Sequence, residues 1–147
     1  MNKDWRIALS FLWLGFIGAI SFLEAWLKFK APGITIELGL GIGRLVFQSL
    51  NKIEWLIILL ILINSLLLKV RFNLYHYLIP ILLVVILLFD TFYLLPQLDF
   101  RAEMIIKGMN PGHSYLHIIY IGLEIYKALC LLLFSYLLNK NIISNYK

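Results

Sequence analysis

A row of polar and ionisable side chains runs along the last hydrophobic segment of this sequence. His113, His117, Tyr120, Glu124 and Lys127 follow one another at steps of four, three, four and three residues. At about 100° per residue, these steps place all five within roughly 80° of one another around a helix. An ionisable group at the centre of a membrane span costs about 2.5 kcal/mol or more, so it usually faces a bundle interior, a cavity or a partner. The stripe therefore indicates a binding site.

Other ionisable residues lie toward the same side of the membrane in the expected topology. Asp90 and Glu24 belong to two neighbouring hydrophobic segments and approach the depth of the stripe. Because two or more acids beside one lysine leave excess negative charge in a low dielectric, one carboxyl should stay protonated or take up a cation. We predict a cleft that binds or passes a small ligand, ion or proton. Its predicted lining is Glu24, Asp90, His117, Tyr120, Glu124 and Lys127, supported by Lys28, Asp99 and Arg101.

Three other interpretations of the stripe stay open. The polar groups could simply join helices, because an interhelical hydrogen bond contributes about 0.6–2 kcal/mol. His113 and His117 have the spacing of two metal ligands on one helix face, with a third ligand supplied through space. His117 could also be an axial ligand of haem in a bundle core. No serine or cysteine nucleophile with a nearby base stands out, so no catalytic residue is assigned and the sequence favours a protein that is not an enzyme.

The composition makes lipid the solvent for most of the chain. Of its 147 residues 62% are hydrophobic, more than a soluble domain of this size can bury. A helix needs about 20 apolar residues to cross the hydrocarbon. We therefore predict an all-α, four-helix transmembrane bundle formed by a single domain over 1–147. Its spans are expected at about 5–27, 53–69, 74–98 and 114–138.

An additional amphipathic helix is expected between the first two spans. Thr35 can cap a helix over about 35–50, which we predict to lie along the membrane interface. Gly39, Gly41 and Gly43 alternate within it; close helix packing explains them better than a phosphate-binding loop, because the third glycine of the dinucleotide fingerprint is missing. A second connection is expected as a loop from residue 97 to 112.

The distribution of charged residues indicates what the protein contacts and how it is oriented in the membrane. The net charge of +5 is spread over loops and chain ends, which indicates contact with the bilayer surface and not with nucleic acid. The two sides of the membrane carry equal numbers of basic residues in the expected topology, but the basic residues near the termini have few acids beside them. We therefore predict an integral protein of the bacterial inner membrane with both termini in the cytoplasm.

Several short motifs resemble those of a protein family. They are the stretches Glu24-Ala-Trp-Leu-Lys-Phe-Lys-Ala-Pro-Gly33, Gly43-Arg-Leu-Val-Phe47, Asn51-Lys-Ile-Glu54 and Leu95-Pro96-x-Leu-Asp99-x-Arg101, followed by His117-x-x-Tyr120-x-x-x-Glu124-x-x-Lys127. With them the chain resembles a group of small uncharacterised bacterial four-span membrane proteins. More distantly it is similar to the domain-of-unknown-function family that includes animal transmembrane proteins linked to metal-drug resistance, and to copper-resistance membrane proteins of the CopD type.

The distant resemblances imply metal or haem handling. The chain departs from the copper proteins because it lacks methionine-rich or cysteine ligands. Besides a ligand, ion or proton site, two functions therefore remain. One is a non-catalytic subunit or assembly factor that meets another membrane protein or a second copy of itself. The other is a haem- or metal-binding membrane protein.

Overall fold

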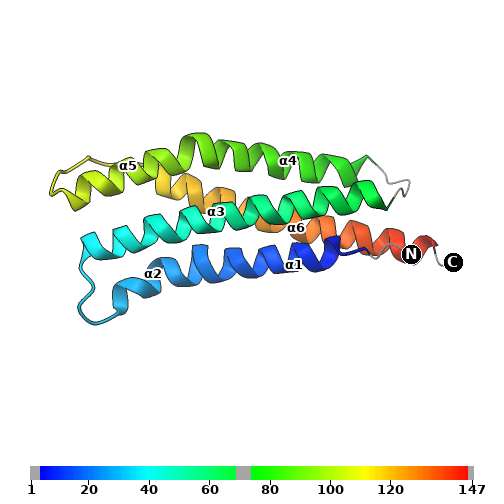
Figure 1. Ribbon diagram of the computed structural model, residues 1–147, viewed down its shortest axis with the longest axis horizontal. Helices are drawn as coiled ribbons and strands as arrows, with labels where there is room; N and C mark the ends of the chain where they lie inside the picture. The colour runs from blue at the N-terminus through cyan, green and yellow to red at the C-terminus, as the bar shows by residue number, and fades with distance from the viewer. Residues whose placement is uncertain (1–3, 69–73, 146–147) are drawn as a thin grey trace.

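The protein is a bundle of four long helical segments that lie side by side, with both chain termini at one end (Figure 1). The computed structural model describes residues 4–68 and 74–145. Four of its helical stretches are long and apolar enough to cross a membrane, namely Arg6–Lys30, Ile36–Leu67, His76–Ile106 and Leu116–Lys140. The predicted all-α, four-helix transmembrane architecture is therefore confirmed.

Two of the four spans contain π-helical turns. The first span consists of α1 (Arg6–Phe16), the π-helical segment η1 (Ile17–Glu24), α2 (Ala25–Leu27) and the short 3₁₀ segment η2 (Lys28–Lys30). The third consists of α4 (Tyr75–Phe89), the π-helical segment η3 (Asp90–Leu94) and α5 (Leu95–Ile106). The second is α3 (Ile36–Leu67), and the fourth is α6 (Leu116–Asn145). π-Helical turns are rare in proteins, and those that occur are often found at functional sites.

The helix expected along the interface is the first half of α3. Thr35 caps it as expected, since its Oγ1 accepts a hydrogen bond from the Leu38 N–H at 3.2 Å. The helix then continues without interruption for 32 residues. The chain therefore forms one helix where the sequence predicted a separate helix over 35–50 and a span starting at 53. No proline interrupts this stretch. Two of its glycines lie close to the first span: a Cβ on Gly39 would lie 2.2 Å from the Phe29 ring, and one on Gly43 would lie 2.9 Å from Lys28 Nζ.

The third span is also longer than expected. Residues up to Ile106 are helical, where the sequence indicated a loop from residue 97. Pro96 has no N–H for the helical ladder, and the π-helical turn of η3 directly precedes it, so the helix passes the proline without ending. The loop proper is short. Gly108 and Gly112 take positive φ angles of 76° and 73° there, which only glycine adopts easily.

An apolar core fills the half of the bundle nearer the termini. It is built from residues of all four spans: Trp13, Ile17, Ile57, Ile58, Ile61, Ile79, Leu83, Leu87, Cys130, Leu131, Phe134 and Leu138. Leucines on the outer faces, such as Leu66 and Leu129, are exposed and match a lipid surrounding. The core ends where the polar side chains of the site begin.

Candidate functional site

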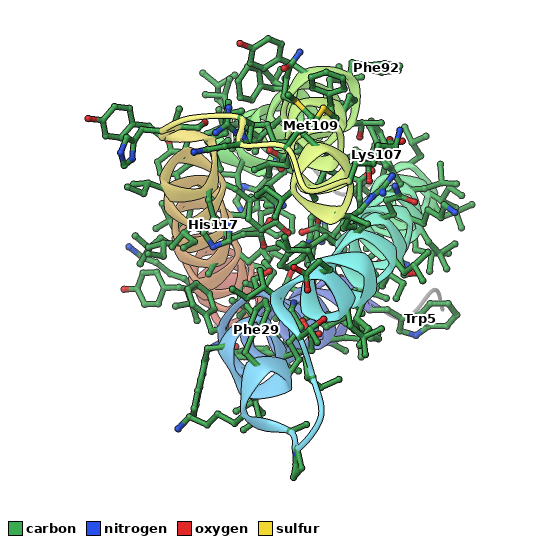
Figure 2. All side chains as sticks on the ribbon, turned by 90° about the vertical axis from the view of Figure 1, so that its left-hand side faces the viewer. Trp5, Phe29, Phe92, Lys107, Met109 and His117 are labelled. Atoms are coloured by element: carbon green, nitrogen blue, oxygen red, sulfur yellow. The ribbon has the colours of Figure 1, made fainter. Side chains whose placement is uncertain are left out.

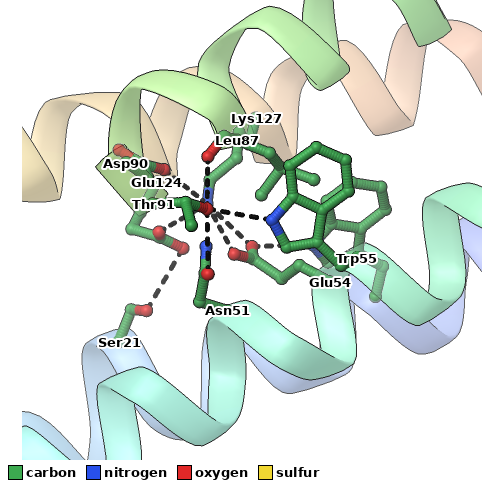
Figure 3. A network of polar contacts seen from close by, with 10 residues as sticks. Ser21, Asn51, Glu54, Trp55, Leu87, Asp90, Thr91, Glu124 and Lys127 are labelled. Carbon is green, nitrogen blue, oxygen red and sulfur yellow. Dashed lines mark hydrogen bonds and ion pairs between the residues drawn. The ribbon is translucent and has the colours of Figure 1, made fainter. Parts of the chain in front are cut away.

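Lys127 lies at the centre of a buried ionic cluster. Its Nζ is 2.7 and 2.9 Å from the two carboxylate oxygens of Glu54, 3.1 Å from Asp90 Oδ2 and 2.7 Å from Glu124 Oε1 (Figure 3). None of the four side chains is more than 2% exposed. Three helices supply them: α3 carries Glu54, η3 begins with Asp90, and α6 carries both Glu124 and Lys127. We call these four residues the Lys127 cluster.

The first span completes the cluster through neutral donors. Trp13 Nε1 donates a hydrogen bond of 2.8 Å to Glu54 Oε1, and Ser21 Oγ donates one of 3.2 Å to Glu124 Oε2. Ser21 lies within the π-helical segment η1, just as Asp90 lies at the start of η3. Both irregular turns therefore present a polar side chain to the same buried group of acids.

A second hydrogen-bonded group fixes α3 against η3. The Thr91 hydroxyl accepts a bond of 2.9 Å from Trp55 Nε1 and lies 3.0 Å from Asn51 Oδ1 and 2.6 Å from the Leu87 carbonyl oxygen (Figure 3). Thr91 follows Asp90 in the chain, and Asn51 lies one turn before Glu54. This group therefore holds the two helices in the register that brings Glu54 and Asp90 to the same lysine.

The cluster lies near the middle of the helices that are long enough to cross a membrane. At 1.5 Å per residue, Glu54 is about 27 Å from the start of α3 and about 20 Å from its end. Asp90 is about 21 Å from the start of the span His76–Ile106 and about 24 Å from its end. Since half the hydrocarbon thickness of a bilayer is about 15 Å, both acids lie farther than that from either end of their helices.

Charge in the cluster does not balance when every group is ionised. Three carboxylates and one ammonium sum to two negative charges. A net charge in hydrocarbon is costly, and carboxylates that share a site do not all ionise together. Asp90 Oδ1 is moreover buried and has no hydrogen-bond partner among the described residues, so a proton on this oxygen would relieve part of the excess negative charge. The arrangement can therefore hold protons or a small cation.

The structure brings only part of the predicted cleft together. Asp90, Glu124 and Lys127 form the cluster, and Tyr120, 3% exposed, packs its ring against Phe47 at 5.1 Å between centroids. Glu24 does not join them. Its Oε2 pairs with Lys28 Nζ at 3.1 Å, one turn along its own helix.

The two histidines of the stripe lie outside the cluster. His113 and His117 are exposed at the end of the bundle opposite the termini. Within residues 4–68 and 74–145, no group of three or more His, Cys, Asp or Glu side chains is arranged to hold a metal ion. The geometry therefore gives the metal and haem interpretations no further support.

Glu54 is the member of the cluster that sequence reasoning missed. The second span was expected to begin at residue 53, which put Glu54 at the membrane edge, where an acid calls for no partner. The signal was nevertheless present: Asn51, Glu54, Ile58 and Ile61 recur at helical steps and share the buried face of α3. A continuous helix from residue 36 would have placed Glu54 deep in the bilayer.

The residues expected to support the cleft line a cavity of their own. A cavity of about 290 Å³ lies at the end opposite the termini and is bordered by Lys28, Asp99, Arg101 and His117. Phe47 also lines this cavity, and its ring contacts Tyr120. Along α6, His117, Tyr120 and Glu124 succeed one another from the cavity to the Lys127 cluster, so this aromatic pair lies at the boundary between the two.

A smaller polar group lies at the opposite end of the bundle. Arg6, 1% exposed, pairs with Asp4 at 2.6 Å, and the Trp5 N–H donates to Asn64 Oδ1 at 3.1 Å. His76 is buried at this end as well. Burial alone would raise the pKa of Asp4, but hydrogen bonds from Arg6 and its charge outweigh burial and lower that pKa below the ordinary value.

Fold and site define the class of protein: an integral membrane protein that forms a four-helix bundle around buried ionisable residues. In three comparisons, no family model, no curated protein and no solved structure matches this chain.

Proposed function

We propose that the protein binds a small ion at the Lys127 cluster, and that the ion is the proton. One observation carries the proposal: three buried carboxyl groups surround a single buried ammonium. Two protons on the three carboxyls bring the cluster to neutrality. A proton also needs no coordination shell, whereas a metal cation would have to displace the Lys127 ammonium from oxygens at 2.7–3.1 Å.

We propose that protons reach the Lys127 cluster from the side of the bundle that holds the cavity. The polar stripe of α6 runs from His117 through Tyr120 to Glu124, and Ser21 contacts Glu124 from the facing span. On the other side of Lys127, the same face of α6 continues with Leu131, Phe134 and Leu138, which are fully buried and apolar. These contacts favour exchange of protons with one side of the membrane; passage to the other side would require the apolar half to rearrange.

Infrared spectroscopy of the purified protein tests proton binding. Protonated carboxyl groups absorb at a different infrared frequency from carboxylates. We expect bands of protonated carboxyl groups at neutral pH, and we expect each of the variants Glu54→Gln, Asp90→Asn and Glu124→Gln to remove part of this absorption. Glu103→Gln, which alters a surface pair with Lys107 at 2.7 Å, is the matched control and should leave the bands unchanged. If none of the three variants removes a protonated band, all three carboxyls are ionised and proton binding is refuted.

A second measurement separates a proton site from a structural network. If the apolar half rearranges so that protons pass, protein in vesicles that enclose a pH-sensitive dye should take up protons after an external acid pulse, and Glu124→Gln should slow that uptake. Glutamine keeps hydrogen-bonding capacity and size, so a network that only joins helices would leave uptake at the level of the control. Equal proton uptake by vesicles with the wild type, with Glu124→Gln and without protein would contradict passage of protons across the membrane. Proton binding at the cluster would then be decided by the infrared measurement alone.

We further propose that the protein belongs to a bacterial inner membrane with both termini in the cytoplasm, and that it is related to the small four-span proteins that its motifs resemble. The two termini share one end of the bundle, as the four spans require. The acid-poor basic residues near the termini support a cytoplasmic position for that end.

A further inference from the structure

The cavity at the end opposite the termini has the size and the wall of a ligand site. Its volume of about 290 Å³ is at the lower end of the range for small-molecule pockets. At about 30 Å³ per water-sized group, that is room for roughly ten non-hydrogen atoms. All four spans border it, and apolar side chains such as Phe29, Phe47 and Leu98 make up much of its wall. The end-on view shows Phe29 and His117 on separate helices around this end (Figure 2).

Positive charge is in excess around the cavity. Lys28, Arg44 and Arg101 line it, against the single carboxylate of Asp99. Arg44 Nη2 donates to Asp99 Oδ2 at 2.8 Å, and Glu24 offsets Lys28 at 3.1 Å.

Arg101 has no carboxylate partner within the described part of the chain. Its guanidinium donates instead to the backbone carbonyl oxygens of Pro111 and Gly112, at 3.3 and 2.5 Å. One positive charge is therefore left for an anion.

By helix length, the cavity lies where lipid headgroups meet the hydrocarbon. It is bordered by residues 39–48 of α3, about 5–18 Å from the start of a helix about 48 Å long. A helix of that length exceeds the hydrocarbon thickness of about 30 Å by about 18 Å. With the bilayer centred on the helix, about 9 Å extends into the headgroups at each end, so the cavity reaches from the headgroups into the hydrocarbon. Trp26, with the Lys30 ammonium 4.2 Å from its ring centroid, is an interfacial anchor close by.

We propose that this cavity binds an anionic amphiphile, with its carboxylate or phosphate group at Arg101 and Lys28 and the start of its alkyl chain against Phe29 and Phe47. An apolar wall with one uncompensated guanidinium where lipid headgroups meet the hydrocarbon complements such a molecule in both charge and polarity. Neither a free inorganic anion nor a neutral lipid satisfies both halves of the wall.

Binding of oleate to the purified protein in a neutral detergent tests the proposal. We expect one saturable site, with an affinity at least about tenfold higher for oleate than for oleyl alcohol, which has the same chain without the charge. Inorganic phosphate should not displace bound oleate. If the natural ligand is a bilayer lipid, phosphatidylglycerol should compete with oleate and phosphatidylcholine should not. If oleate binds tightly and phosphatidylglycerol does not compete with it, a free fatty acid is the better fit.

Two variants and a control locate the binding at this cavity. Arg101→Gln removes the uncompensated charge and should weaken oleate binding by about tenfold or more. Ala102→Leu, which fills the cavity while keeping every charge, should do the same even if Arg101→Gln disturbs the loop at Pro111. Lys107→Gln is the matched control, because Lys107 is a cation at the same end that does not line the cavity.

Oleate binding that is equal in the wild type and Ala102→Leu would overturn the proposal, as would binding of inorganic phosphate as tight as that of oleate. The proton proposal does not depend on this result, because the carboxyl bands of the Lys127 cluster are measured without added amphiphile. Either proposal can thus fail while the other stands.

Discussion

Lys127 is the residue on which the ionic cluster depends. Removing one member of a buried ion pair costs about 3–5 kcal/mol, because the remaining charge loses its counter-ion and cannot reach water. We therefore expect Lys127→Met to lower the free energy of unfolding by about that amount. Unfolding of the protein in detergent by heat or denaturant measures the change.

The control for Lys127→Met is Lys107→Met. Lys107 also pairs with a glutamate, Glu103 at 2.7 Å, but its side chain is 61% exposed. Exposed pairs contribute about 0–1 kcal/mol, so this substitution should change stability little. A Lys127→Met protein as stable as Lys107→Met would show that the lysine does not hold the cluster together.

Asp4 gives the terminal end of the bundle a dependence on acid. Its pKa is lowered because Arg6 hydrogen-bonds to the carboxylate and attracts it, despite burial. A carboxyl with a lower pKa in the folded state stabilises the protein above its unfolded pKa, and that contribution is lost as the pH falls through the folded pKa. We expect Asp4→Asn to be less stable than the wild type at neutral pH and equally stable in strong acid, as measured by thermal unfolding. A constant difference at every pH would contradict this assignment.

At the residue scale, helical spacing in the sequence could group side chains on one face of α6 but could not identify their partners on other helices. Helical spacing is enough to place His117, Tyr120, Glu124 and Lys127 on one face. It does not say which carboxyl of a neighbouring helix lies opposite, because that depends on the relative shift of the helices. Glu24 and Glu54 illustrate the point: Glu24 finds Lys28 on its own helix, and Glu54 takes the place beside Lys127.

Among the elements, the continuity of α3 distinguishes the structure most sharply from the expectation. Spin labels at positions 37 and 66, with Cys130→Ala as background, should be about 44 Å apart along a straight helix. Residues 35–50 lying flat on the membrane would bring them to roughly 31 Å, the diagonal of two perpendicular helical halves. Pulsed electron paramagnetic resonance distinguishes the two distances between the labels, and the shorter distance would refute the continuous helix.

The glycines of α3 offer a paired test of how this helix meets the first span. A Cβ at Gly41 meets nothing within 4 Å, whereas one at Gly39 falls 2.2 Å from the Phe29 ring. Gly41→Ala should therefore stabilise the protein by about 0.5–1 kcal/mol through helix propensity. Gly39→Ala should lose that gain, because Phe29 must move. Equal effects of the two substitutions on thermal unfolding would contradict the packing of Phe29 on α3.

Element boundaries were the least predictable feature of the fold. Four apolar segments are enough to predict four spans, since length and polarity decide that number. The two long helices were cut short in the prediction at a polar stretch and at Pro96. Packing against neighbouring helices and a π-helical turn, neither visible in a single segment, keep them helical.

For the whole molecule, the orientation in the membrane is the property to test. Single cysteines at positions 107 and 140, each in the Cys130→Ala background, lie on exposed sites at opposite ends of the bundle. With cytoplasmic termini, a membrane-impermeant thiol reagent added to intact cells should label position 107 and spare position 140. Labelling of position 140 but not 107 would reverse the orientation, and labelling of both would contradict the topology.

The Lys127 cluster also has a consequence for how the chain enters the bilayer during synthesis. Helix α6 carries Glu124 and Lys127 one turn apart, so it can insert as an internally neutralised unit. Helix α3 and the third span each bring one acid of the cluster, Glu54 and Asp90, whose ion-pair partner Lys127 lies on another helix. Such an acid enters hydrocarbon at lower cost with a proton attached. Under the proposed proton binding, a bundle assembled in this way would hold two protons from the start, the number that makes the Lys127 cluster neutral.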